Sequence, residues 1–129
     1  SNLHTILAAM EAAMKNGNGG DGPENDIEAL LYGIRLCPTC SSLIHIADNQ
    51  VTPRDMILLP NVTMPVKVIT CHRYGSAVNT NLLNIASATN GSLHTLEEDI
   101  INLSGIPIGG VIVIGTYRYR RTTYGYTRI

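Results

Sequence analysis

The chain has 129 residues, 44% of them hydrophobic, which is enough for one domain with a buried core. Its formal net charge of −1 argues against a nucleic-acid-binding protein on global grounds. No apolar run reaches the roughly 20 residues that cross a membrane, and no signal peptide is visible, so we expect no membrane partner. Three cysteines fit a reduced, cytoplasmic environment better than a disulfide framework.

The first half of the chain alternates predicted helices with an apolar strand. Apolar residues recur at helical spacing between residues 3 and 14, which predicts an amphipathic helix. After a glycine-rich loop, Pro23 suits the first turn of a second helix, whose buried face lies in 27–34. The run 43–47 predicts a buried strand, and 52–59 is expected to be helical.

The second half repeats this alternation. The run 66–70 predicts a second strand, and 92–94 predicts a short third strand. Asn79 is expected to cap the helix between them. Thr95 and Glu98 match a capping box, which predicts a final helix.

Strands that alternate with helices predict an α/β fold with a doubly wound, mostly parallel sheet and flanking helices. We expect this partial domain to occupy residues 1–107. Residues 108–129 are β-rich and lack a helix signal, so they predict a C-terminal hairpin packed on the same domain. Its turn is expected at Thr122-Thr123 or at Gly125.

Three segments resemble von Willebrand factor type A domains. Residues 19–25 (GGDGPEN), followed by IEAL, resemble a loop-to-helix segment of that family, especially the Asp-x-Pro-Glu loop of its integrin β-subunit version. Residues 44–49 (IHIADN) are similar to the strand that ends in Thr-Asp-Gly. Residues 81–92 (NLLNIASATNGS) resemble the late helix, where Leu-x-x-Ile-Ala and Thr-Gly-Gly recur. The order and spacing agree over residues 3–104.

The resemblance implies adhesion or complex assembly, with Mg²⁺ or Ca²⁺ at the carboxyl ends of the strands. It assigns metal ligation to Asp48 and Glu24, with Asp21 in support. The family's leading Asp-x-Ser-x-Ser motif is absent, so the chain resembles the C-terminal two-thirds of such a domain. The metal site is then incomplete, and no tightly bound cofactor is expected. Alternatively, Asp48 is a strand-end turn residue and Glu24 interacts with a helix dipole.

Cys37 and Cys40 raise two alternatives, a thiol redox enzyme and half of a zinc site completed by Cys71 and His72. The pair follows a helix, whose negative end disfavours a thiolate. If strands 43–47 and 66–70 are parallel, about 16 Å separates Cys40 from Cys71, too far for shared ligation. The pattern therefore favours a loop with two small thiols and no redox activity.

The C-terminal segment also combines stacking and basic groups, which could bind single-stranded nucleic acid. These residues are Tyr117, Arg118, Tyr119, Arg120 and Arg121. On a strand, however, the tyrosines share one face and Arg118 and Arg120 share the other. A tyrosine face on the core and an arginine face in water explain the pattern without a ligand.

The sequence thus predicts a protein-binding or assembly module rather than an enzyme. Nucleic-acid contact is the alternative, and thiol redox chemistry comes third. The scattered histidines support no Ser-His-Asp triad, because such triads are defined by a geometry that the sequence alone does not show.

In the family fold the strand at 43–47 pairs with an earlier strand. The C-terminal segment or a second copy of the chain must take the place of that strand. We therefore expect a homo-oligomer, with 43–47 or 111–119 in the interface.

Overall fold

The structure, a computed structural model, describes residues 3–16, 23–50, 52–71 and 75–129. The helices are α1 (Leu3–Asn16), α2 (Asp26–Leu36) and α3 (Thr80–Ala88), with short 3-10 helices at Met56–Asn61 and Leu103–Gly105. The strands are β1 (Pro23–Glu24), β2 (Leu43–Asp48), β3 (Thr52–Pro53), β4 (Val66–Cys71), β5 (Ser92–His94), β6 (Asp99–Ile100), β7 (Val111–Ile114), β8 (Tyr117–Thr122) and β9 (Gly125–Arg128). In these ranges no helix is long and apolar enough to cross a membrane.

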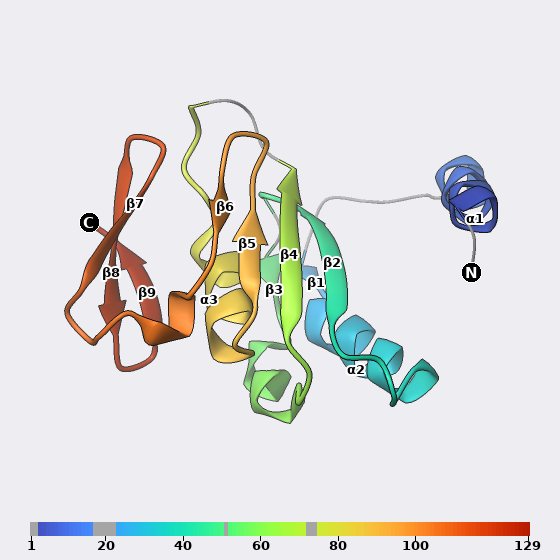
Figure 1. Cartoon of the computed structure of the whole chain (residues 1–129), viewed down its shortest axis with the longest axis horizontal. Helices are drawn as coiled ribbons and strands as arrows, with labels where there is room; N and C mark the ends of the chain where they lie inside the picture. The colour runs from blue at the N-terminus through green and yellow to red at the C-terminus, as the bar shows by residue number, and fades with distance from the viewer. Residues whose placement is uncertain (1–2, 17–22, 51, 72–74) are drawn as a thin grey trace.

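The chain has a mixed α/β fold built on a four-stranded sheet of order β2-β4-β5-β6 (Figure 1). The first three strands are parallel and β6 is antiparallel to β5. This confirms the predicted strands near 43–47, 66–70 and 92–94 and their parallel pairing. α2 packs against β2, and α3 packs against β4 and β5. β1 and β3 form a separate two-stranded parallel pair.

Alternate residues of β4 show which face of the sheet the helices cover. Val66, Val68 and Thr70 are buried, whereas Lys67 and Ile69 are exposed. Side chains of a strand alternate between faces, so one face of β4 lies in the core and the other does not. The core continues through Leu82, Leu83, Ile85 and Ala86 of α3, all fully buried.

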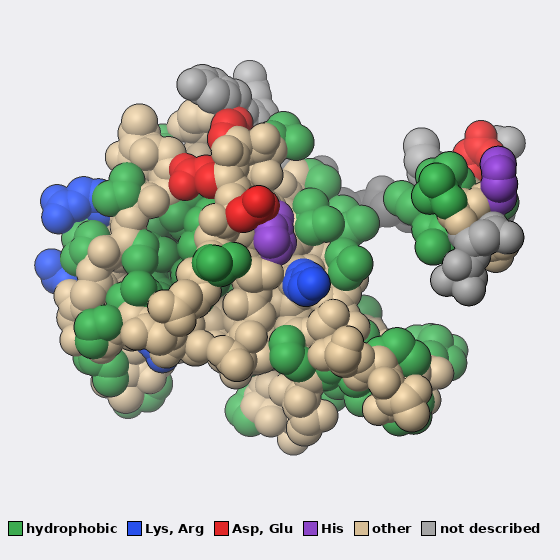
Figure 2. All heavy atoms as spheres, viewed as in Figure 1, with side chains coloured by type: hydrophobic (Ala, Val, Ile, Leu, Met, Phe, Trp, Pro, Cys, Tyr) green, Lys and Arg blue, Asp and Glu red, His purple; other side chains and the backbone are tan. Residues whose placement is uncertain are grey.

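The opposite face of the sheet, called the open face below, has no helix against it in the described ranges. Its side chains come from Ile44, Ile46, Lys67, Ile69, Ser92 and His94, because registered partners share a face. Ile44 is 65% exposed and Ile46 is 57% exposed. Figure 2 shows hydrophobic side chains gathered over β2 and β4 on this side. α1 lies apart from the sheet (Figure 1), and the side chains of its residues Leu3, Ile6, Leu7 and Met10 are also exposed.

Both ends of α3 follow local rules. The Asn79 side chain accepts a hydrogen bond from the amide of Asn81, so the predicted cap is confirmed. After the helix, Asn90 adopts a left-handed conformation with φ of 57°. A Cβ on Gly91 would collide with the carbonyl of Val66, so only glycine permits this close approach to β4.

The C-terminal segment forms a three-stranded antiparallel sheet, β7-β8-β9, which packs against α3. Tyr119 is fully buried, and its hydroxyl accepts from the amide of Val78 at 2.8 Å and donates to its carbonyl at 3.1 Å. The hydroxyl of Tyr126 donates to the carbonyl of Leu103 at 2.6 Å. The predicted turn is confirmed, because β8 ends at Thr122 and β9 begins at Gly125. The segment does not fill the position beside β2.

Three local predictions need correction. The final helix predicted from Thr95 is wrong, because the chain turns back and β6 pairs with β5. Residues 52–59 form β3 and then a 3-10 helix rather than one helix. Pro23 lies in β1, ahead of α2, and not in the first turn of that helix.

The buried hydroxyl of Tyr119 gives a test of how the C-terminal sheet is attached. Tyr119→Phe leaves the amide and carbonyl of Val78 without this partner in a buried position. We expect the free energy of unfolding to fall by about 1–3 kcal/mol. Urea denaturation followed by circular dichroism measures it. Tyr124→Phe is the control, because Tyr124 is 96% exposed. Equal stabilities for the two variants would contradict a stabilising role for the hydrogen bonds between Tyr119 and Val78.

The same packing predicts a loss of stability in alkali. Burial raises the pKa of Tyr119 above 10.0, and the hydrogen bond with Val78 opposes this only in part. Burial likewise raises the pKa of Tyr126. The folded state therefore holds these protons more tightly than the unfolded state. Stability should be complete below the unfolded pKa of about 10 and decline as the pH rises above it. Tyr119→Phe should make the decline shallower in denaturation at pH values from 8 to about 11.

Candidate functional site

The carboxyl ends of β2 and β4 are held together by side-chain amides. The Oδ1 of Asn49 accepts from the amide of Asn79 at 2.8 Å and from the hydroxyl of Thr70 at 3.3 Å. Its Nδ2 donates to the carbonyl of Ala77 at 2.7 Å. The Asn79 side chain in turn donates to the carbonyl of Asn49 at 2.9 Å. This network fixes the start of α3 beside the end of β2, the position where open α/β sheets bind ligands.

Two of the three predicted metal ligands lie around one cavity at this end of β2. The cavity has a volume of about 200 Å³, and its lining includes Glu24, Asp26, His45 and Asp48. The Oδ1 of Asp48 accepts from the amide of Gln50 at 3.1 Å, as in a strand-end turn. Asp21 lies outside the described residues. The described ranges contain no cluster of three or more histidine, cysteine or acidic side chains that could hold a metal ion.

The neighbouring Asp26 and His45 form a pair that the sequence did not predict. The Nε2 of His45 lies 2.8 Å from the Oδ2 of Asp26, between β2 and the start of α2. Asp26 is only 5% exposed, and its other oxygen, Oδ1, has no hydrogen-bond partner in the described part of the chain. His45 is therefore a partnered residue at the base of the cavity. The pair ties α2 to β2 and gives the cavity an acidic wall.

The start of α2 is capped from a distant segment. The carboxylate of Asp55 accepts from the amide of Ile27 at 3.2 Å and from that of Glu28 at 2.8 Å. Asp55 is 7% exposed, so the charge is buried against the positive end of the helix. Asp55 thus takes the helix-terminal role that was expected of Glu24. Glu24 is left exposed at the cavity.

A second cavity, of about 470 Å³, lies beside Asp48 at the carboxyl end of the sheet. Ile69, Cys71 and Leu96 line it together with Asp48. Asp48 and Cys71 are register partners, so their side chains point to the same face. Cys71 is the free cysteine of the chain and is exposed. Asp48 thus lines both the acidic cavity and a more apolar one.

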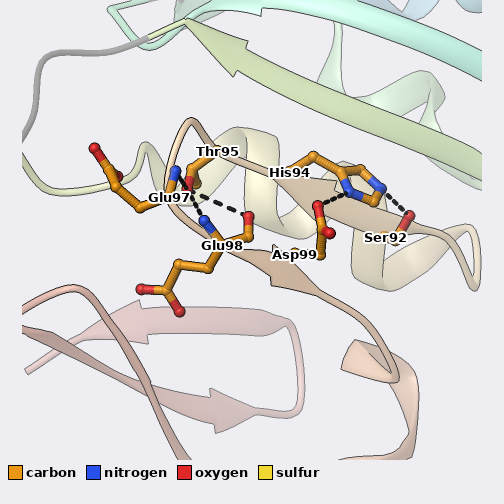
Figure 3. A network of polar contacts seen from close by, with 6 residues as sticks. All are labelled: Ser92, His94, Thr95, Glu97, Glu98 and Asp99. Atoms are coloured by element: carbon orange, nitrogen blue, oxygen red, sulfur yellow. Dashed lines mark hydrogen bonds and ion pairs between the residues drawn. The ribbon is translucent and has the colours of Figure 1, made fainter.

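Ser92, His94 and Asp99 form a hydrogen-bonded chain on the open face (Figure 3). The hydroxyl of Ser92 lies 2.7 Å from Nε2 of His94, and Nδ1 of His94 lies 2.7 Å from Oδ1 of Asp99. The order matches nucleophile, base and orienting acid. Yet Asp99 has a side chain that is 76% exposed, so the pair is not held in a water-excluded site. His94 and Asp99 are also register partners, and their contact stabilises the pairing of β5 with β6.

The sequence missed this network because of the helix wrongly predicted after residue 95. Thr95 does act as a cap, since its hydroxyl accepts from the amides of Glu97 at 3.1 Å and Glu98 at 3.0 Å (Figure 3). The chain then reverses, and the amide of Thr95 donates to the carbonyl of Glu98 at 2.9 Å. The available signal was the spacing of Ser92 and His94, which places both on one face of a strand.

Cys37 and Cys40 are joined by a disulfide between the end of α2 and the start of β2. The expectation of two thiols in this loop is therefore wrong. Cys40 precedes the first residue of β2 and Cys71 is register partner of its last, Asp48. This agrees with the argument that Cys40 and Cys71 cannot share a zinc ion. His72 lies outside the described residues.

The aromatic and basic residues of the C-terminal segment lie as the alternation predicted. Tyr119 is buried, Tyr117 is half-buried, and Arg118 and Arg120 are exposed. Arg121 donates from Nη1 to the carbonyl of Leu103 at 2.7 Å, so it is used within the fold. Of the five candidate nucleic-acid contacts, Arg118 and Arg120 present a free surface. Neither tyrosine offers an exposed ring for base stacking.

In comparisons with known proteins, no family model, curated protein or solved structure matches the chain.

The geometry predicts weak metal binding by this chain alone. Glu24 and Asp48 provide oxygen donors, but two carboxylates make a poor cage for Mg²⁺ or Ca²⁺. Isothermal titration calorimetry with either ion should give no tight binding. A micromolar site that disappears in Asp48→Ala would overturn this expectation, and Glu97→Gln serves as the control for a general loss of negative charge.

Proposed function

We propose that the chain is a protein-binding, assembly module with a von Willebrand A-like, doubly wound fold, and not an enzyme. The observation that carries the proposal is the edge of β2 opposite β4, called the free edge below. Within the described residues β2 pairs only with β4. An unpaired apolar strand next to an uncovered sheet face is a surface on which a polypeptide can add a strand.

The free edge presents hydrogen-bonding groups at alternate residues. The amides of Leu43 and Asn49 donate to carbonyls on the β4 side, at 2.9 and 3.2 Å. Peptide groups alternate along a strand, so those of Ile44, Ile46 and Asp48 point away from β4. Ile44 and Ile46 also present apolar side chains on the open face. A strand added here gains main-chain hydrogen bonds and apolar contacts together.

The carboxyl end of the sheet supports a metal-assisted form of this binding. Asp48 ends the free edge, and Glu24 faces the same acidic cavity. A hard divalent cation prefers oxygen ligands and needs more than these two. A strand added beside β2 would end next to Asp48 and can bring the missing hydroxyl and carboxylate ligands. The order of the three family-like segments agrees with this arrangement.

Nucleic-acid binding and thiol redox chemistry have less support. Tyr119 is buried and Arg121 is bonded within the fold, so of the five candidate residues Arg118 and Arg120 are the ones exposed for phosphate contact. Cys37 and Cys40 form a disulfide at the carboxyl end of α2, far along β2 from the acidic cavity at Asp48. We therefore retain strand binding as the function.

A synthetic strand tests the proposal directly. The probe is a short peptide with an alternating apolar strand followed by Asp-x-Ser-x-Ser. We expect it to bind the chain, and Mg²⁺ to tighten the binding, because the peptide completes the ligand set around Asp48. Fluorescence anisotropy of the labelled peptide, with and without Mg²⁺, measures both effects.

Matched variants separate the edge from the metal. Asp48→Asn should remove the effect of Mg²⁺ while peptide binding persists, and Glu97→Gln should change neither. Ile46→Pro should weaken peptide binding, since it removes a donor from the free edge but none from the β4 side. If the peptide fails to bind at concentrations where the chain is monomeric, or if Mg²⁺ acts equally on Asp48→Asn, the proposal is wrong.

A further inference from the structure

We propose that the occupant of the free edge is a second copy of the chain, paired antiparallel through β2 about a two-fold axis. This inference rests on the proposed function and names its partner. A two-fold axis perpendicular to the sheet makes the two β2 strands antiparallel and keeps both open faces on one side. The result is a continuous sheet of order β6-β5-β4-β2-β2-β4-β5-β6, with the isoleucines of both copies side by side.

The register of this pairing follows from the residues of the free edge. Only the even-numbered residues direct peptide groups outwards, so even residues must face even residues. With Ile44 opposite Ile46, both isoleucine pairs are apolar and Asp48 faces Ser42, whose hydroxyl can donate to the carboxylate. With Ile46 opposite Ile46, Asp48 faces Ile44 instead. With Ile44 opposite Ile44, Asp48 faces Cys40. Of these three registers, the one with Ile44 opposite Ile46 is the one that pairs apolar side chains with each other and also places the acceptor Asp48 opposite a donor.

The same pattern favours a second copy over another segment of the chain. The strand has a hydrogen-bond donor near one end, Ser42, and an acceptor at the other end, Asp48. Two antiparallel copies of it therefore place each donor beside an acceptor. The segment β7–β9, the other candidate for this position, is committed to α3 through Tyr119 and Tyr126. α1 can cover an open face but cannot satisfy the peptide groups of the free edge, because its own are bonded within the helix.

Sedimentation velocity across the micromolar range tests the dimer. We expect the wild-type chain to dimerise and Ile46→Pro to sediment as a monomer, because proline removes an edge donor at the centre of the interface. Circular dichroism checks that Ile46→Pro keeps its fold. Ile57→Lys is the control, because Ile57 is 87% exposed and lies in a 3-10 helix outside β2. That variant should remain a dimer.

Amide hydrogen exchange by NMR locates the interface in the wild-type chain. In a dimer the amides of Ile44 and Ile46 should become protected as the concentration rises. The protection is roughly 15-fold when the total protein is about 100 times above the dissociation constant, because about 7% of the chains are then still monomers. The amides of Leu43 and His45, which face β4, should be protected at every concentration. A dimer without concentration-dependent protection at Ile44 and Ile46 overturns the inference.

The outcomes distinguish the inference from the proposed function. If the chain stays monomeric at every concentration while the strand peptide still binds, the second copy is wrong and strand binding stands. If neither the peptide nor a second copy binds, both fail. Leu7→Glu in α1 gives a last check: a dimer lost in this variant but kept in Ile46→Pro has its interface on α1, which also overturns the inference.

Discussion

The register of β2 against β4 is the constraint on which the other features depend. Because Leu43 is opposite Val66 and Asp48 is opposite Cys71, one set of alternate residues lies under the helices and the other forms the open face. A slip of one residue would move Ile44 into the core and place His45, the partner of Asp26, in solvent. The close approach of Gly91 to Val66 then positions α3 and β5 on the same frame. The acidic cavity and the free edge follow from this single register.

The parts of the fold that the sequence predicted correctly are those set by nearby residues. The apolar runs at 43–47 and 66–70 become β2 and β4, and Asn79 caps α3 through a side-chain bond two residues away. Thr95 shows the limit of such reasoning. Its hydroxyl forms the expected cap bonds, yet no helix follows, because pairing of β6 with β5 satisfies the next backbone groups. A local signal fixes a turn, whereas long-range pairing decides what comes after it.

The candidate site depended on contacts that no local pattern contains. Asp55 reaches the start of α2 from 27 and 28 residues away, and Asp26 pairs with His45 across 19 residues. The sequence placed Asp48 correctly at a strand end but gave the helix-terminal role to Glu24. Position along a strand follows from periodicity, whereas the partner of a buried charge follows from folding. This is why the sequence indicated where the cavity lies but did not predict the Asp26–His45 pair that lines it.

The free edge and the acidic cavity meet at Asp48, and this has an energetic consequence. The outward peptide group of Asp48 belongs to the edge, and Asp48 also lines the acidic cavity, so a strand and a cation bound there would share one residue. A strand that supplies a carboxylate ligand brings another negative charge close to Asp48 and Glu24. A bound cation offsets the repulsion between these charges. The two binding events then favour each other by the same factor, as linkage requires. A second copy paired through Ser42 offers a hydroxyl but no additional carboxylate, so self-pairing should be insensitive to Mg²⁺. Under the proposal a ligand-bearing strand should depend on it, so Mg²⁺ would favour such a strand over a second copy at β2.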